Sequence, residues 1–507
     1  MPAALRLLIG ALWLSATGVS ARFSANTEVD HRRDFAESVQ PRQPDEGASD
    51  TRQSLITFAD PRAKAFEVDG KKIPDVHWDA GRSWAGLMPI SGDANETRKL
   101  FFWYVSFVAC SAGLLYATVT VAYYGRFWPT TDPESLKNLV FWTNGGPGCS
   151  SLEGFLQENG PISWSWGQAE PTPNPWSWTQ LSNMLWVEQP VGTGFSQGEP
   201  TINDDNALAA QVAGFLEQFL DIFSELKGSN FWVTGESYAG FFVPYIANYL
   251  YENPSPDLQL KGIWMADPSL TWDLVHQSIP SLGFVQANRN VFPFNSTFMA
   301  QLQNMSDACG FTDYFDRYVR YPPWGQLPFP VGATVDPVTR IVGECPRLAA
   351  LDAEIHLLQP VSVERPLSPL PHHHPVSDEH SRTEVQTAIN APTMHWKTCN
   401  HAVYADPETG ELSEVDPSVP SALSVLPNVI EKSERVVIVH GLAGFQSPIE
   451  EESFLVDDMG VFGHTHTERG LTYVEMFYSG HMAPQFVPWA TYQTMAYVLG
   501  KRDSPSA

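Results

Sequence analysis

The chain has 507 residues, of which 43% are hydrophobic and 12% aromatic, enough for one large domain with insertions or for two or three smaller domains. Its formal net charge of −27 and its pI near 4.8 exclude nucleic acid as the main partner, because phosphate binding requires positive charge. An acidic surface is typical of secreted and vacuolar proteins, but it identifies no substrate.

The N-terminus has the pattern of a secretory signal. Arg6 supplies the positive start, Leu7–Ala16 the apolar core and Val19–Ala21 a small-residue cleavage site, so residues 1–21 are predicted to be a signal peptide. The acceptor pattern for N-glycosylation in exported proteins begins at Asn95, Asn295 and Asn304. Five cysteines in an oxidising compartment predict two disulfides and one unpaired cysteine.

Two segments near the N-terminus differ from a globular core. Residues 22–57 are polar with mixed charges, which predicts a pro-segment or a disordered lead. Leu100–Gly125 contains no charge and is long enough to span a bilayer. A span there would leave the later sequons and cysteines in the cytosol, and the run is rich in Ser, Thr, Tyr and Gly. We therefore do not expect a membrane helix.

Strand and helix patterns alternate along the rest of the chain. Apolar spacing predicts helices over Leu208–Phe223 and Ala239–Tyr251. Runs typical of buried strands are found at Leu139–Thr143, Trp186–Gly194 (ending in a glycine turn), Phe231–Thr234, Lys261–Met265, Val436–His440 and Leu471–Phe477. This alternation predicts an α/β fold, with a mostly parallel central sheet and helices on both faces. The core is expected over residues 58–291 and 391–500, with a proline-rich cap insertion over residues 292–390.

The segment Gly235–Gly240 (Gly-Glu-Ser-Tyr-Ala-Gly) has the pattern of a nucleophile elbow, a tight turn between a strand and a helix with Ser237 at its apex. Its small residues allow the strand and the helix to approach, and N–H groups at the helix start then face an oxyanion. The alternative is a Ser-Gly turn without function. Glu236 would oppose the negative charge of acyl transfer, so we expect it to be protonated, through burial or a second carboxyl group, in an enzyme that favours acidic pH.

Two further segments complete a hydrolase pattern. Adjacent glycines in Asn144–Ser151, directly after a strand, free backbone N–H groups to face a ligand. His481 lies in a loop after the last predicted strand. A lone histidine is more often a hydrogen-bonded surface residue, but a nucleophile that precedes the histidine in the chain is typical of the α/β-hydrolase fold.

Four motifs together resemble the serine carboxypeptidases, specifically their fungal secreted or vacuolar members. The motifs are Trp142–Ser151, Val187–Ser196, Gly235–Gly240 and Ser479–Met482. The resemblance extends, with interruptions, over roughly residues 60–500. It implies an α/β-hydrolase that removes single residues from peptide C-termini through an acyl-enzyme, with no cofactor and no metal.

The resemblance also implies roles for individual residues. Ser237 is the implied nucleophile and His481 the general base. The implied oxyanion donors are the N–H groups of Gly146 and Tyr238. The groups implied to bind the substrate carboxylate are Asn144, the Gly145 N–H, Glu158 and Glu236. Two carboxyl groups that share a proton donate a hydrogen bond to an anion at acidic pH and repel it once both are ionised. The implied disulfides are Cys149–Cys399 and Cys309–Cys345, which leaves Cys110 unpaired.

Three segments depart from the family pattern, and each has the form of a block gained or lost. Gly444 stands where the family carries the aspartate of the catalytic triad, and residues 104–126 form an extra block. Pro346–Arg382 does not resemble the family cap, and its Pro371–Pro375 histidine tract is interpreted as an exposed loop rather than a metal site. Loss of the triad acid predicts a fall in rate on the order of 10⁴-fold.

The sequence therefore predicts a serine carboxypeptidase of the secretory pathway, secreted or vacuolar, that acts on peptide or protein C-termini, with activity reduced by the missing acid. Two alternatives stay open. One is a catalytically inactive relative that binds peptide C-termini. The other is an esterase or acyltransferase that uses the same Ser237.

Overall fold

The computed structural model describes residues 58–106, 137–165, 168–272, 274–289, 292–319, 325, 327–329, 334–335, 342–343, 381–441, 452–457 and 459–506. All of them belong to one compact unit from Arg52 to Ala507. The predicted signal peptide and pro-segment, Cys110, Cys345, Gly444 and the histidine tract lie outside the described residues.

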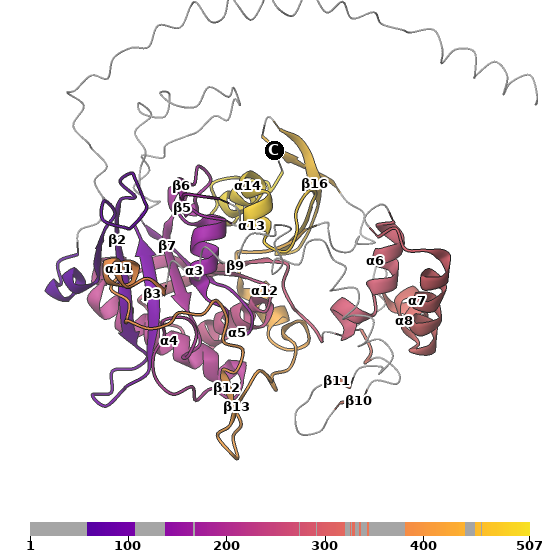
Figure 1. The fold of residues 1–507 in the computed structure, drawn as a ribbon, viewed down its shortest axis with the longest axis horizontal. Helices are drawn as coiled ribbons and strands as arrows, with labels where there is room; N and C mark the ends of the chain where they lie inside the picture. The colour runs from indigo at the N-terminus through magenta and orange to yellow at the C-terminus, as the bar shows by residue number, and fades with distance from the viewer. Residues whose placement is uncertain are drawn as a thin grey trace, which may run out of the picture. The chain divides into compact units, whose positions relative to one another are not determined.

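An 11-stranded sheet is the centre of the fold (Figure 1). Its strands, in spatial order, are β1 (Glu67–Asp69), β2 (Arg82–Pro89), β3 (Lys99–Val105), β7 (Asn183–Glu188), β4 (Asn138–Thr143), β8 (Ser229–Glu236), β9 (Leu258–Ala266), β14 (Arg435–Gly441), β17 (Leu471–Met476), β16 (Gly460–Glu468) and β15 (Glu452–Val456). The six central strands pair in parallel, in the spatial order β7, β4, β8, β9, β14 and β17. The strands at both edges pair antiparallel. The sheet therefore has the mostly parallel centre that the sequence predicts.

The start of the long apolar run is a strand. Leu100–Val105 lies within β3, fully buried between β2 and β7. The rest of the run, from residue 107, lies outside the described residues. In the described part of the chain no helix combines the length and the apolar character that a membrane span needs.

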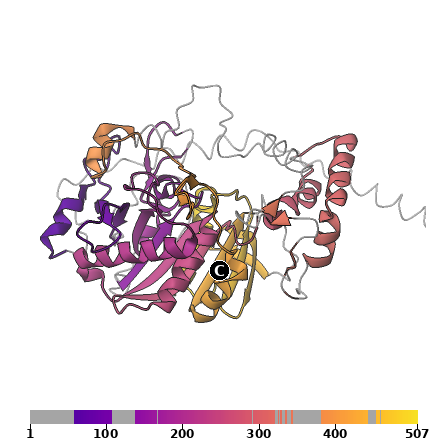
Figure 2. The same cartoon turned by 90° about the horizontal axis from the view of Figure 1, so that it is seen from below.

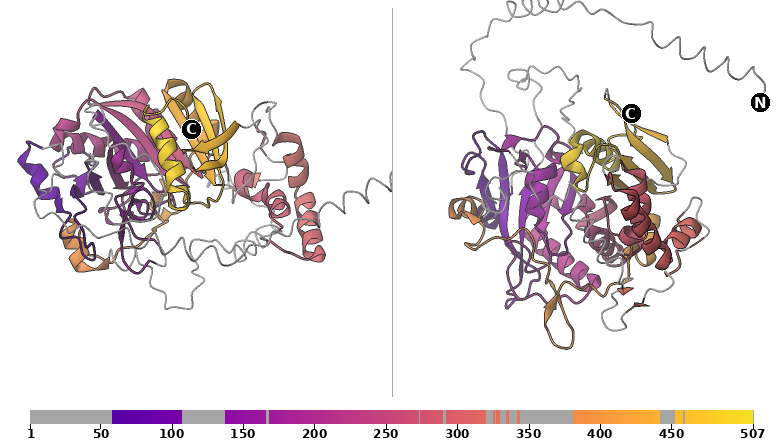
Figure 3. Two further views of the ribbon diagram at one scale, coloured as in Figure 1. Left: turned by 90° about the horizontal axis from the view of Figure 1, so that it is seen from above. Right: turned by 45° about the vertical axis from the view of Figure 1, so that its right-hand side comes forward.

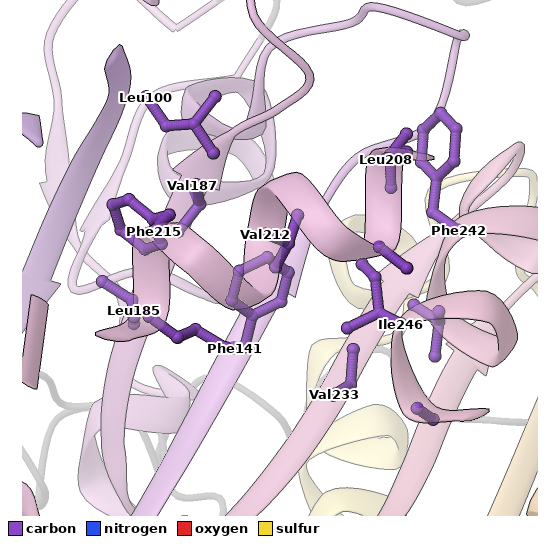
Figure 4. Packing of buried hydrophobic residues seen from close by; sticks show 14 of the residues in the cluster. Leu100, Phe141, Leu185, Val187, Leu208, Val212, Phe215, Val233, Phe242 and Ile246 are labelled. Carbon is purple, nitrogen blue, oxygen red and sulfur yellow. The ribbon is translucent and has the colours of Figure 1, made fainter. Parts of the chain in front are cut away.

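Helices cover both faces of the sheet because alternate residues of each central strand point to opposite sides (Figure 2). One face packs against α4 (Asp205–Ile222), α5 (Ala239–Glu252) and α12 (Leu426–Lys432). The other packs against α3 (Ser151–Gly154), η3 (Phe155–Asn159), α11 (Thr383–Ala388), α13 (Ala483–Phe486) and α14 (Pro488–Val498). Figure 4 shows Val212 and Phe215 of α4 near Phe141 and Leu185 of the sheet, and Leu208 near Phe242 of α5. Each such fully buried side chain contributes about 1.5–3 kcal/mol to folding.

A separate hydrophobic cluster is formed by η6 (Leu274–Ser278), α6 (Ser281–Ala287), α7 (Ser296–Ala308) and α8 (Phe311–Tyr318) (Figure 3). This cluster includes Leu274 and Val285, so it begins before residue 292, where the sequence predicts that the insertion starts. The boundaries of the insertion stay a prediction. The remaining short elements are η1 (Pro61–Phe66), β5 (Ile162–Ser163), β6 (Thr172–Pro173), η4 (Trp178–Gln180), η5 (Ser224–Leu226), β10 (Thr334–Val335), β11 (Val342–Gly343), β12 (Tyr404–Ala405), β13 (Leu412–Ser413) and η7 (Ser421–Leu423).

Candidate active site

Ser237 occupies a strained turn between β8 and α5. Its φ of +65° is a conformation that residues other than glycine rarely adopt. The Ser237 N–H donates to the Ala266 carbonyl at 3.0 Å, and the Ser237 carbonyl accepts from the N–H groups of Gly240 and Ser269, each at 2.9 Å. Three backbone hydrogen bonds therefore hold Ser237 at the carboxyl edge of the sheet, between the neighbouring strand and the start of α5.

Two glycines allow the backbone to approach this turn closely. A Cβ atom on Gly235 would lie 2.5 Å from the Thr143 carbonyl oxygen, and one on Gly145 would lie 2.3 Å from the Tyr238 nitrogen. Gly146, the next residue, has a φ of +113°. The loop after β4 thus packs directly on the residue that follows Ser237, and it brings the two segments with the predicted oxyanion donors, Gly146 and Tyr238, into contact.

Glu158 and Glu236 form a buried pair beside the turn. Each is 3% exposed, and their carboxyl groups share a hydrogen bond. Asn144 Nδ2 donates to Glu158 Oε1 at 3.3 Å, whereas Oε2 of each glutamate contacts no N–H or hydroxyl donor. Two carboxyl groups in this arrangement retain one proton between them. Burial raises the pKa of Glu158 to about 7. Burial, and then the charge of Glu158, raise the pKa of Glu236 well above its usual range.

The Asn144 side chain is oriented by two donors. Its Oδ1 accepts from Trp142 Nε1 at 2.8 Å and from the Gly154 N–H at 3.2 Å. The amide group is therefore fixed with Nδ2 toward Glu158. The structure brings Asn144, Gly145, Glu158 and Glu236 together near Ser237, and their role in binding a substrate carboxylate stays a prediction.

Asp267 is a further acidic residue at this edge, and the sequence analysis missed it. It follows β9 directly, with a φ of +39°, and its charge contributes to the raised pKa values of Glu158 and Glu236. Its Oδ1 atom contacts His440 Nδ1 at 3.0 Å and accepts from the Gly441 N–H at 3.1 Å. One signal in the sequence could have identified Asp267. It is a polar residue at the carboxyl end of a strand, and that strand lies next to the strand before the nucleophile.

His481 is exposed in the loop between β17 and α13. The backbone of this loop packs on the end of β14, since a Cβ atom on Gly441 would lie 2.5 Å from the Gly480 carbonyl oxygen. Gln485 of α13 donates through Nε2 to Gln157 Oε1 at 3.1 Å, next to Glu158. The His481 loop is therefore anchored at the same edge of the sheet as Ser237.

No acid contacts the His481 ring in the part of the chain that the structure describes, and no hydrogen bond there joins that ring to Ser237 Oγ. Asp457, an acid that follows Gly444 in the chain, is paired with Arg502, whose Nη2 lies 3.1 Å from Asp457 Oδ1. The connection that contains Gly444, at residues 442–451, and Asp458 lie outside the described residues. The expectation that the triad acid is missing therefore stays a prediction.

A disulfide joins Cys149, in the loop after β4, to Cys399. Cys309 is also disulfide-bonded, and its expected partner lies outside the described residues. Among the described residues, one group of His, Cys and acidic side chains is close enough together to hold a metal ion: Cys149, Cys399 and His401. The disulfide between the two cysteines removes both thiolates as ligands. The predicted glycosylation acceptors Asn95, Asn295 and Asn304 are all exposed.

The parallel central sheet and the serine at a strand-to-helix elbow define an α/β-hydrolase. A serine carboxypeptidase family model matches residues 79–316. A probable serine carboxypeptidase of Arthroderma benhamiae is 37% identical over 504 residues, covering 88% of each chain. Serine-type carboxypeptidase F of Aspergillus niger is 34% identical over 502 residues, covering 88% of this chain and 89% of the relative. The chain belongs to the serine carboxypeptidase family.

The crystal structure of Kex1(Δ)p, a prohormone-processing carboxypeptidase from Saccharomyces cerevisiae, shares the fold. The TM-score is 0.59 at 19% sequence identity, covering 87% of this chain and 96% of that one.

Proposed function

We propose that the protein releases C-terminal residues from peptides at acidic pH, with Ser237 as the nucleophile. The observation that carries the proposal is the buried Glu158–Glu236 pair next to the elbow. A pair that retains a proton donates a hydrogen bond to a peptide's terminal carboxylate. Simple ester hydrolysis requires no such group.

The proposed reaction is acyl transfer in two steps. Ser237 Oγ attacks the carbonyl carbon of the last peptide bond while His481 accepts the hydroxyl proton, and the N–H groups of Gly146 and Tyr238 stabilise the oxyanion. His481 then donates that proton to the leaving amine, and the terminal amino acid departs. Water, deprotonated by His481, cleaves the acyl-enzyme and restores Ser237.

The pH dependence follows from the number of protons on the pair. With one shared proton, the pair and the Asn144 amide bind the terminal carboxylate. When both glutamates are ionised, their charges repel that carboxylate, so binding weakens as pH rises through the pair's apparent pKa.

The rate is expected to be low because Gly444 stands where the family has an acid. Without that acid, nothing fixes the imidazole tautomer of His481 or stabilises its cation, which costs on the order of 10⁴-fold.

Binding of peptide C-termini without turnover is the second candidate function. The observation that favours it is that no described carboxylate contacts His481. Both functions use the same carboxylate site, so peptide binding alone does not separate them. An esterase or acyltransferase on Ser237 is a third candidate, which would be indifferent to a free terminal carboxylate.

Export is part of the proposal, with the protein secreted or vacuolar. It is supported by the predicted signal peptide and by the Cys149–Cys399 disulfide, which persists in oxidising compartments.

A fluorophosphonate probe tests the nucleophile. It should label the protein between pH 4 and 7, and Ser237→Ala should abolish labelling. Resistance of the purified protein to the probe over this range would favour the binding function. The second comparison uses a peptide with a free C-terminal carboxylate and the same peptide with a C-terminal amide. Cleavage of both at equal rates would favour the esterase function.

A further inference from the structure

A second pair of carboxyl groups lies behind Tyr238, the residue after the nucleophile. Tyr238 Oη donates to Asp416 Oδ2 at 2.9 Å. Asp416 in turn shares a hydrogen bond with Asp205, which is the first residue of α4. The Asp205 side chain is fully buried. Asp205 Oδ1 accepts from Tyr404 Oη at 2.7 Å. The buried Asp205 Oδ2 contacts no N–H or hydroxyl donor.

This arrangement requires a proton between the two aspartates, because two ionised carboxyl groups have no hydrogen to share. Asp205 Oδ2 is the atom that can hold it. Burial first, and the charge of Asp416 second, raise the pKa of Asp205 well above its usual range. The pair then has a single negative charge, which the start of a helix tolerates.

No cation offsets a second negative charge among the groups with the largest influence on Asp205. These are Asp416, Tyr404 and Asp204. Tyr238 contacts Asp416. Burial raises the pKa of Tyr245, and the charges of both aspartates raise it further. Ionisation of both members would therefore place two like charges in contact, one of them buried.

The pair lies where residues 404–419, here called the strap, cross α4 and α5. The Ala405 N–H donates to the Ile202 carbonyl at 2.7 Å, and the Asp205 N–H donates to Ser418 Oγ at 2.8 Å. Tyr245 of α5 donates to the Val419 carbonyl at 2.7 Å. Tyr404 of the strap also belongs to the hydrophobic cluster that contains the buried side chains of α4 and α5.

We propose that Asp416 is a positioning residue for Tyr238, and that its bond to Asp205 keeps the strap closed on Tyr238 while the two aspartates share a proton. The Tyr238 ring stacks on Phe241 with ring centres 4.9 Å apart, and its hydroxyl is held by Asp416. The ring also meets Phe242 edge-on, with ring centres 5.3 Å apart. These contacts fix the side chain of the residue whose N–H group is proposed to face the oxyanion. Loss of the shared proton loosens the strap and frees Tyr238 to rotate.

The catalytic consequence rests on the proposed function and adds a second pH dependence to it. The Glu158–Glu236 pair acts on substrate binding, whereas the Asp205–Asp416 pair acts on the reactivity of Ser237. A fluorophosphonate probe separates the two effects, because it has no terminal carboxylate and reports only the nucleophile and the oxyanion donors.

The experiment compares the labelling rate of the wild type with that of Asp205→Asn from pH 5 to pH 8. An amide at position 205 donates to Asp416 at every pH. The ratio of the variant rate to the wild-type rate should therefore rise with pH, on the order of tenfold, less than the 10²–10³-fold lost when an oxyanion donor is removed. A change with pH that is common to both proteins cancels in the ratio.

Two further variants sharpen the test. Asp204→Asn keeps a good helix cap but removes a negative charge that helps to raise the pKa of Asp205, so its ratio to the wild type should stay at or below one. Tyr238→Phe keeps the N–H group and removes the hydroxyl. Tyr238→Phe should lower the labelling rate at pH 5. The double variant with Asp205→Asn should be labelled at the same rate as Tyr238→Phe alone. A level ratio for Asp205→Asn, or additive effects in the double variant, would overturn the proposal.

Hydrogen exchange tests the strap without any activity. After correction for intrinsic rates, residues 404–419 of the wild type should exchange faster at pH 8 than at pH 5, and those of Asp205→Asn should not. If Ser237 fails to react but this difference appears, the proposed function fails and the strap proposal stands. Equal protection of the wild-type strap at both pH values contradicts the proposal, whatever the enzyme activity.

Discussion

Replacement of Glu236 by glutamine tests the carboxylate site most sharply. The buried pair holds one proton up to the pKa of Glu236, which burial, and then the charge of Glu158, raise well above its usual range. Above that value each pH unit should weaken binding of a peptide acid about tenfold, or ~1.4 kcal/mol. The affinity of the wild type for a peptide acid should therefore fall as pH rises through that pKa. An amide at position 236 cannot ionise and donates a hydrogen bond at every pH, so Glu236→Gln should flatten most of this dependence.

The assay is fluorescence anisotropy of a labelled peptide between pH 5 and 8, in a Ser237→Ala background that prevents turnover. Glu153→Gln is the matched control. This variant removes the charge of Glu153, which also raises the pKa of Glu236, and it leaves the Glu158–Glu236 pair intact. A C-terminally amidated peptide controls for contacts elsewhere. Wild-type affinity that does not change with pH, or a Glu236→Gln profile that follows the wild type, would refute the assignment.

Three other predictions follow from the same packing. Burial raises the pKa of Glu188 to about 7, so its contribution to stability, about 3 kcal/mol, is complete below pH 4.5 and is lost as pH rises toward 7. Urea unfolding at both ends of this range should show that loss in the wild type and not in Glu188→Gln. Cys149→Ser opens a disulfide to Cys399 with a sequence separation of 250 and should lower the unfolding free energy by about 5 kcal/mol in the same measurement, whereas an unchanged midpoint would contradict this. Gly145→Ala places a Cβ atom 2.3 Å from the Tyr238 nitrogen, so fluorophosphonate labelling should fall about 10²-fold while circular dichroism stays native. Labelling at the wild-type rate would show that the loop after β4 is not part of the oxyanion site.

Local patterns carried much of the fold. β4 and the Phe231–Thr234 part of β8 are charge-free runs of mostly large residues, as expected of strands covered on both faces, and α4 and α5 follow the apolar spacing of their sequences. The elbow was recognisable because Gly235 and Ala239 permit a turn that few other residues allow. The start of the apolar run was harder to interpret. A fully buried strand such as β3 has the same composition as the start of a membrane span, and only its pairing with β2 and β7 distinguishes the two.

The polar pairs were predictable only in part. Glu158 and Glu236 were expected together because both lie in positions that the family resemblance marks. Asp205 reads in sequence as an ordinary acidic residue in the first turn of a helix, and nothing near it predicts Asp416 as its partner. The contact between Asp267 and His440 likewise depends on the register of β9 and β14. Which buried acids meet is decided by strand register and loop path, which periodicity does not encode.

The central claim is that Ser237 cleaves the last peptide bond of a substrate through an acyl-enzyme. The most direct measurement is mass spectrometry of a peptide acid incubated with the protein at pH 5 in ¹⁸O-labelled water. The account predicts slow, stepwise loss of C-terminal residues, with ¹⁸O in the shortened peptide, and no loss with Ser237→Ala or with an amidated peptide. A peptide that stays intact with the wild type, or that is shortened equally by Ser237→Ala, would contradict it.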